Sequence, residues 1–253
     1  MESKRYFIEF SYDGTAFHGW QKQPNAISIQ ELIEDGLSNL LRCKTSVVGA
    51  GRTDSGVHAR QMFAHFNASI NKGFFKELVY LLNSYLPKSI NIMSIERVKT
   101  SAHARFDAVE RTYKYYISTI KDPFNNSYHY FMKNPPDIDL MNEASKIIIG
   151  CKDFKSFSKS HSDVKTFICE IKNAFWYQKD NQLIFSITSN RFLRNMVRSI
   201  VGTLLEIGFK KTTFEDLKKI IKSRDRSRAG FSVPANGLFL TKIVYPSNIY
   251  IRQ

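Results

Sequence analysis

The sequence predicts an α+β protein made of two similar halves, each in the order β-α-β-β-α-β of a split ferredoxin-like (RRM-like) unit. Three observations lead to this fold class. Runs rich in β-branched and aromatic residues mark strands, apolar residues at helical spacing mark helices, and the second half of the chain repeats the order of the first. We place the boundary between the two halves near residues 99–108 and expect domains at 1–104 and 105–253.

In the first half, the predicted strands lie at 5–12, 45–51, 62–69 and 90–98, and the predicted helices at 28–42 and 75–86. The first helix opens with Ser28 and Glu31 at the spacing of a capping box, in which each residue satisfies a free backbone N–H of the other. The second helix should stop before Pro87, because proline disfavours helical backbone in the residue that precedes it.

In the second half, strands are predicted at 111–119, on both sides of the turn KDN within 166–189, and at 237–245. Helices are predicted at 138–149, 191–208 and 214–224, and the polar segment 151–166 is interpreted as an insertion loop. On the helix from Arg191, residues Arg191, Arg194 and Arg198 should form one basic stripe, because they are spaced at i, i+3 and i+7.

Composition and charge narrow the function. The 253 residues are 43% hydrophobic and carry a net charge of +14. No apolar run approaches the roughly 18 residues of a membrane span, and the first residues do not resemble a secretory signal. Residues 191–228 hold eleven Lys and Arg against four Asp and Glu. A focused basic field favours a nucleic acid partner, although a lysine-rich solvated surface explains the charge equally well.

Cysteine and histidine give no sign of a metal or disulfide framework. Cys43, Cys151 and Cys169 are odd in number and far apart, and no CxxC pair exists. The six histidines match no metal-ligand spacing. We therefore expect three free thiols in a reducing cytosol and no bound metal.

The stretch VGAGRTDSGVHAR, residues 48–60, carries the most specific signal. Asp54 is the only acid between Asp35 and Glu77, and it lies among three glycines and two arginines. The stretch has neither the lysine of a phosphate-binding loop nor the glycine spacing of a dinucleotide site. Two interpretations stay open: an aspartate that bonds its own backbone in a turn, or a carboxylate presented as nucleophile or base and kept ionised by a nearby arginine.

The segment GAGRTDSGVHA resembles the catalytic loop of the tRNA pseudouridine synthase A family. Further blocks that resemble the family follow in order along nearly the whole chain: YDGTAFHGWQKQP with SIQELIE, LNSYLP, HARFDAVERTYKYYI, DFKSFSK, NRFLRNMVRSIVGTLLEIG and AGFSVPANGLFL. The sequence departs from the usual family pattern at Ala102, Lys152, Phe231 and Ser232, and none of these positions matches a catalytic residue of the family.

The resemblance implies a pseudouridine synthase fold with an extended mixed, mainly antiparallel sheet and a central basic cleft. It implies an isomerase that converts uridine to pseudouridine at positions 38–40 of the tRNA anticodon arm. The expected enzyme is a cytoplasmic homodimer that needs no cofactor and no metal. A catalytically silent tRNA-binding paralogue and a hydrolase that uses Asp54 with His58 are the alternatives.

The resemblance also assigns the site. Asp54 matches the catalytic aspartate, Arg198 matches the basic residue that pairs with it, and Tyr113 matches the tyrosine that contacts the uracil. Leu238 matches an apolar wall of the pocket. Arg52 is either an RNA or carboxylate contact or a solvated loop arginine, and Arg194 belongs to the basic stripe that contacts phosphate. Asp54 and Arg198, which come from different halves, should meet within salt-bridge distance.

Overall fold

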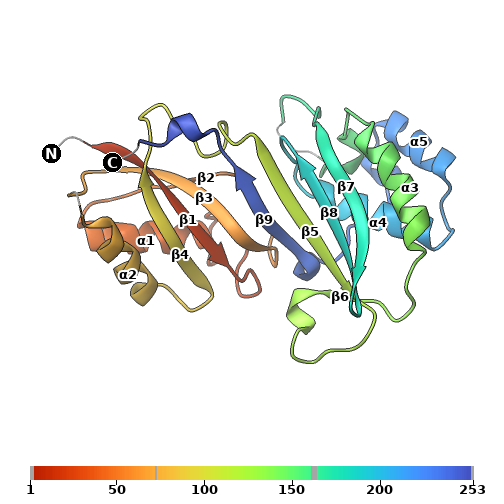
Figure 1. Cartoon of the computed structure of the whole chain (residues 1–253), viewed down its shortest axis with the longest axis horizontal. Coiled ribbons are helices and arrows are strands. Elements are labelled where there is room, and N and C mark those ends of the chain that lie inside the picture. The colour runs from red at the N-terminus through yellow and green to blue at the C-terminus, as the bar shows by residue number, and fades with distance from the viewer. Residues whose placement is uncertain (1–2, 72, 161–163, 252–253) are drawn as a thin grey trace. The chain divides into compact units, whose positions relative to one another are not determined.

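The computed structural model describes residues 3–71, 73–160 and 164–251 and has mixed α+β structure with mostly antiparallel strands, as predicted (Figure 1). The chain forms two compact units. The first contains the residues up to Val109 together with those from Leu240 onwards, and the second contains Glu110–Phe239. The chain therefore leaves the first unit after Val109 and returns to it within its last strand.

The first unit has the predicted β-α-β-β-α-β order. Its elements are β1 (Lys4–Tyr12), α1 (Ile29–Leu41), β2 (Val48–Gly49), β3 (His58–Ala68), α2 (Phe75–Tyr85) and β4 (Ile90–Arg97). Strand β1 pairs antiparallel with both β3 and β4, and β2 pairs antiparallel with β3. Strand β9 (Leu238–Val244) is the other neighbour of β3, and α1 lies against α2.

Local signals set the ends of both helices of this unit. The Ser28 hydroxyl accepts the backbone N–H of Glu31 at 3.3 Å, as expected for the N-terminal cap. The Glu31 carboxylate forms an ion pair with Lys22 at 3.1 Å. Helix α2 ends at Tyr85, and the next residue, Leu86, is extended and precedes Pro87, so the helix stops before the proline as predicted.

The strand predicted at 45–51 is only two residues long. Side chains of α1 bind the backbone that precedes it. Val47 donates its N–H to the Glu34 carboxylate at 3.0 Å and accepts the Gln30 amide at 3.2 Å. Thr45 donates its N–H to the Ser38 hydroxyl at 3.0 Å. The helix thus takes the hydrogen bonds that a longer strand would have used.

The second unit contains β5 (Glu110–Ser118), β6 (Tyr130–Phe131), α3 (Ile138–Ile149), β7 (Ile171–Lys179), β8 (Gln182–Ser189), α4 (Met196–Gly208) and α5 (Phe214–Ser223). Strand β8 lies between β5 and β7 and pairs antiparallel with both. The short strand β6, which the sequence did not predict, pairs parallel with β5. Helix α3 contacts β7, α4 and α5.

The predicted basic stripe is wrong, because α4 begins at Met196 and not at Arg191. Asn195 has φ of 66°, in the left-handed region, so the helical backbone does not extend to the residues before Met196. The Asn195 amide donates to the hydroxyls of Ser199 at 2.9 Å and Ser232 at 2.7 Å. Arg191 and Arg194 therefore precede the helix, and only Arg198 lies on it.

The interpretation of 151–166 as a polar insertion loop is wrong for residues 154–158. Phe154 and Phe157 are fully buried. The Ser156 hydroxyl donates to the Ile220 carbonyl at 2.7 Å, and Phe154 donates its N–H to the Phe167 carbonyl at 3.0 Å. The buried residues 154 and 156–158 are therefore packed into the core of the second unit, while residues 161–163 lie outside the described residues.

The buried histidine His65 should make the stability of the first unit depend on pH. His65 lies on β3 with only 6% of its surface exposed, and its Nδ1 accepts the backbone N–H of Ala104 at 3.1 Å. Burial lowers the pKa of His65 to about 4, the positive charges of His103 and Arg5 add to this, and Asp107 opposes it. The folded protein thus favours the neutral imidazole.

We expect the free energy of unfolding to fall as the pH drops from about 6.5, the usual histidine pKa, to about 4. The unfolded chain binds the proton first, so this contribution is complete above pH 6.5 and is lost below it. The loss should be on the order of 3 kcal/mol at pH 4. Urea unfolding at pH 7.5, 5.5 and 4.5 measures it. The His65→Asn variant keeps a hydrogen-bond acceptor without a titrating ring, and an equal loss in both proteins would contradict the assignment.

Candidate active site

Residues 50–57 form the loop between β2 and β3, and the turn at its end explains one of its glycines. Ala50 donates its N–H to the Phe63 carbonyl at 2.8 Å where the strands separate. Val57 donates its N–H to the Asp54 carbonyl at 3.2 Å and closes a four-residue turn. Gly56, the third residue of this turn, has φ of 76°, which favours glycine. Asp54 is therefore the first residue of a tight turn.

The turn at residues 13–20 packs directly against the backbone of this loop. A Cβ atom on Gly14 would lie 2.1 Å from the Val57 carbonyl oxygen, and one on Gly19 would lie 2.5 Å from that of Thr53. Gly19 also has φ of 91°. Trp20 donates its N–H to the Thr53 carbonyl at 3.2 Å. The two glycines let the two backbones approach on both sides of Asp54.

Side-chain hydrogen bonds also fix the loop. The hydroxyls of Tyr12 and Thr53 form a hydrogen bond of 2.8 Å, and the Ser55 hydroxyl donates to the Phe17 carbonyl at 3.1 Å. Thr53 and Val57 are buried, Asp54 is half-buried, and Arg52 is exposed. The loop is thus fixed next to Asp54 while the aspartate itself keeps access to solvent.

His58 is part of this support. Its side chain is 1% exposed, and its Nδ1 accepts the Gly14 N–H at 3.0 Å and lies 3.1 Å from the Asp13 carboxylate. A carboxylate thus lies beside the imidazole, which the sequence did not reveal. Because the ring is buried against the turn at 13–20, this geometry gives it a structural role and does not favour the hydrolase alternative.

In the second unit, Tyr113 lies half-buried on β5, and its ring meets Phe192 edge to face, with 5.1 Å between ring centroids. Tyr115 lies two residues further along the strand and thus on the same face. It is fully buried, and its hydroxyl donates to the Pro234 carbonyl at 2.9 Å. Burial raises the pKa of Tyr115 far above its ordinary value. Tyr115 is therefore a core residue, while Tyr113 is only partly covered.

Arg198 and the residues before Leu238 are fixed at the same place. The Arg198 Nε donates to the Val233 carbonyl at 2.7 Å, and Val233 donates its N–H back to the Arg198 carbonyl at 3.3 Å. The next carbonyl, that of Pro234, is the one that Tyr115 binds. Leu238, the first residue of β9, is 5% exposed and follows this segment directly. Helix α4, strand β5 and the residues before Leu238 are therefore joined through two successive carbonyls.

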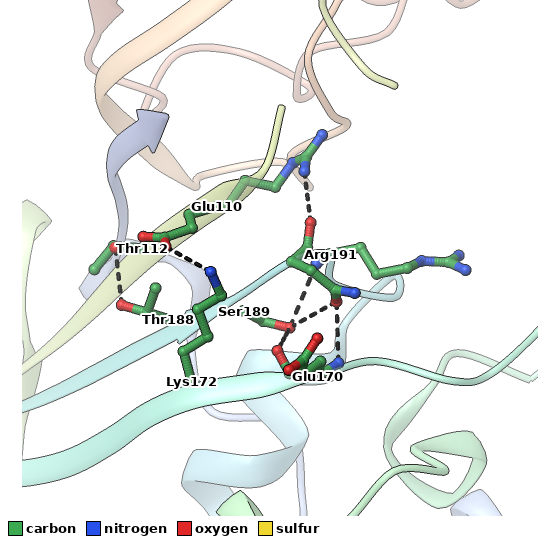
Figure 2. Close-up of polar contacts among 9 residues, drawn as sticks. Glu110, Thr112, Glu170, Lys172, Thr188, Ser189 and Arg191 are labelled. Carbon is green, nitrogen blue, oxygen red and sulfur yellow. Dashed lines mark hydrogen bonds and ion pairs between the residues drawn. The ribbon is translucent and has the colours of Figure 1, made fainter. Parts of the chain in front are cut away.

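A polar cluster at the ends of β5, β7 and β8 binds the residues that precede Phe192 (Figure 2). Arg111, which is 9% exposed, donates to the Asn190 carbonyl at 2.7 Å. The Ser189 hydroxyl donates to the Glu170 carbonyl at 2.8 Å, and Asn190 accepts the Glu170 N–H at 3.0 Å. The cluster also contains the pairs Lys172–Glu110 and Thr112–Thr188. Sequence reasoning missed Arg111, although it lies beside Tyr113 in a segment that resembles the family.

The two remaining predicted residues are exposed. Arg52 lies in the loop of the first unit. Arg194 lies just before α4, and its carbonyl accepts the Lys159 N–H at 2.9 Å. Asp54 and Arg52 thus belong to the first unit, and Tyr113, Arg194, Arg198 and Leu238 to the second. The meeting of Asp54 with Arg198 stays a prediction.

The three cysteines differ in their exposure to solvent. Cys43 is exposed, Cys151 is half-buried and Cys169 is buried, and all three are free. Burial raises the pKa of the Cys151 and Cys169 thiols to about 11, so both stay protonated in neutral solution.

Within residues 3–71, 73–160 and 164–251, no three His, Cys, Asp or Glu side chains gather in a way that could hold a metal ion. No helix in these ranges is long and apolar enough to cross a membrane.

Comparison with known proteins identifies the family. A family model described as tRNA pseudouridine synthase matches residues 9–107 and 144–246. A protein from Bacteroides fragilis named tRNA pseudouridine synthase A is 51% identical over 99% of this chain and 100% of that protein. Proteins of the same name from Parabacteroides distasonis and Clostridium acetobutylicum are 48% and 41% identical, over 98% and 96% of this chain and 98% and 100% of theirs.

The chain therefore belongs to the tRNA pseudouridine synthase family, which confirms the resemblance seen in its motifs. It is an isomerase that acts on uridine in tRNA.

Proposed function

We propose that this enzyme isomerises uridines at positions 38–40 in the anticodon arm of tRNA, with Asp54 as the catalytic group. The observation that carries the proposal is the position of Asp54. It is a half-buried carboxylate on a turn whose flanking residues, Thr53 and Val57, are buried and in contact with the turn at 13–20. A carboxylate that must act on one atom of a bound nucleotide needs such a rigid support.

The reaction breaks the bond between uracil N1 and the ribose C1′, turns the base and forms a bond from C5 to C1′. C5 then loses its proton and N1 gains one, so the product is an isomer of the substrate. Electrons are conserved, so the chemistry requires no redox cofactor. The target base must first leave its stack, which costs a few kcal/mol. Asp54 then acts as the nucleophile or as the base that starts cleavage.

The second unit, together with Arg52 of the first, supplies the remaining roles. Tyr113 packs against the uracil, and Leu238 forms an apolar wall. Arg198 stabilises the charge of Asp54, and its hydrogen bond to the Val233 carbonyl fixes the plane of the guanidinium. Arg52 and Arg194 are exposed and positively charged, which suits contacts to phosphate. We include in the proposal a homodimeric enzyme that works in the cytoplasm, where its tRNA substrates are.

Tritium release from tRNA labelled with [5-³H]uridine tests the activity, because isomerisation frees the hydrogen at C5. We expect release from a tRNA transcript with uridine at positions 38–40, and none from a matched transcript with cytidine at these three positions. Equal release from both would contradict the positions. Binding without any release would favour the silent paralogue.

A further inference from the structure

We propose that Phe106, in the first unit, is a stacking platform for an unpaired base of the tRNA substrate. Its side chain is 73% exposed. The ring lies on the imidazole of His103, with 4.3 Å between ring centroids and 35° between planes. The guanidinium carbon of Arg105 lies 5.7 Å from the centroid of the Phe106 ring. One aromatic ring thus supports Phe106, and a cation lies beside it.

Single exposed apolar residues are common and need no function. Phe106 differs because hydrogen bonds within residues 103–107 fix the turn that carries it. His103 Nδ1 accepts the backbone N–H groups of Arg105 at 3.1 Å and Phe106 at 3.4 Å. The backbone N–H of His103 donates to the Asp107 carboxylate at 2.8 Å, and the backbone N–H of Asp107 donates to the His103 carbonyl at 3.0 Å. Burial lowers the pKa of His103, which keeps Nδ1 available as an acceptor.

The core of the first unit holds the same turn from beneath. The His103 ring meets His65 edge to face at 4.6 Å, and Ala104 donates its N–H to His65 Nδ1 at 3.1 Å. The Tyr245 hydroxyl donates to the Ala104 carbonyl. Arg5 donates to the Ala102 carbonyl at 2.9 Å. The exposed ring is therefore presented on a rigid base, so a ligand that stacks on it would order little of the protein.

Charge and ring chemistry favour a nucleobase as the occupant. Arg105 is next to the ring, and Arg5 contacts the turn that carries it. Aromatic rings combined with arginine are a usual way to bind unpaired bases, since every base has a flat face and its phosphate is negative. The substrate of this family is tRNA, a polyanion whose loops expose such bases. The inference rests on tRNA binding and does not depend on which uridine is modified.

The Phe106→Trp variant makes the contact visible by fluorescence. The two native tryptophans, Trp20 and Trp176, are both 3% exposed, so the new indole would be the accessible one. We expect unmodified tRNA to quench its emission. Phe124 is 90% exposed and lies in the second unit, and the Phe124→Trp variant serves as the matched control without quenching.

Binding of tRNA to Phe106→Ala and Phe106→Leu separates stacking from simple apolar contact. We expect both variants to bind about 5- to 20-fold more weakly, the lower part of the range for removal of a base-stacking ring, while Phe124→Ala binds like the wild type. Urea unfolding checks that each variant is folded. Unchanged affinity in Phe106→Ala, or full affinity in Phe106→Leu, would overturn the proposal. A changed oligomeric state with unchanged affinity would assign the ring to a protein contact instead. Tritium release is not used here, so failure of the anticodon-arm assignment would be seen separately.

Discussion

The Asp54→Asn variant should release no measurable tritium from [5-³H]uridine-labelled tRNA while it still binds that tRNA. The amide has nearly the same shape as the carboxylate, and the hydrogen bond from Val57 that closes the turn uses only the backbone of residue 54. The loop should therefore keep its structure. The amide carries no charge and is neither a nucleophile nor a base, so we expect the rate to fall by at least about 10³-fold.

Single-turnover measurements with enzyme in excess give this rate, and filter binding gives the dissociation constant. Asp35→Asn is the matched control, because Asp35 is an exposed acid on α1 and its replacement removes the same charge. This control should retain full activity. Turnover of Asp54→Asn within tenfold of the wild type would refute the catalytic role of Asp54.

The second large effect concerns Arg198. We expect the Arg198→Met variant to lose roughly 10²-fold or more in the single-turnover rate, as when one positioned charge-stabilising group is removed from a catalytic site. Affinity for tRNA should change by less than about fivefold, because the proposed partner of Arg198 is Asp54 and the phosphate contacts come from other basic residues. The physical reason is the proposed pairing of its guanidinium with Asp54, together with the hydrogen bond that orients it on Val233.

Two further variants sharpen this test. Arg198→Lys keeps the charge but cannot reproduce the planar guanidinium, so its rate should lie between those of the wild type and Arg198→Met. Lys222→Met removes an exposed charge from α5 and should leave the rate unchanged. If Arg198→Met weakened binding and left the rate of bound tRNA intact, Arg198 would be an RNA contact and the pairing would be wrong.

Elements with strong local signals were predictable from sequence. The helix predicted at 138–149 has these bounds in the structure, because an apolar face repeats between Asp137, whose side chain caps it, and Gly150. Helix α2 was equally clear, since Pro87 follows it. Elements that depend on distant partners were not predictable. Strand β2 is short because α1 takes its hydrogen bonds.

In the candidate site, too, features with a local signal were predictable, and those that depend on distant residues were not. Asp54 stood out as a lone acid among glycines, and the family resemblance gave it a role. The apolar spacing around Arg191 looked helical, yet Asn190 is held by Arg111 on β5 and by Glu170, which lies just before β7. The support that Gly14 and Gly19 give to the loop was not predictable either, because it depends on contacts with residues about 35 to 45 positions away.

The return of the last strand to the first unit affects how the protein is made. Val98 bridges to Tyr250, Val109 donates its N–H to the Val244 carbonyl, and Ile243 donates its N–H to the Gln61 side chain. During synthesis these partners emerge only after the whole second unit. At typical translation rates of about 5–20 residues per second, the nascent first unit waits roughly 6 to 26 seconds with the β9-facing edge of β3 uncovered. The loop that carries Asp54 thus belongs to a unit that the ribosome begins first and completes last.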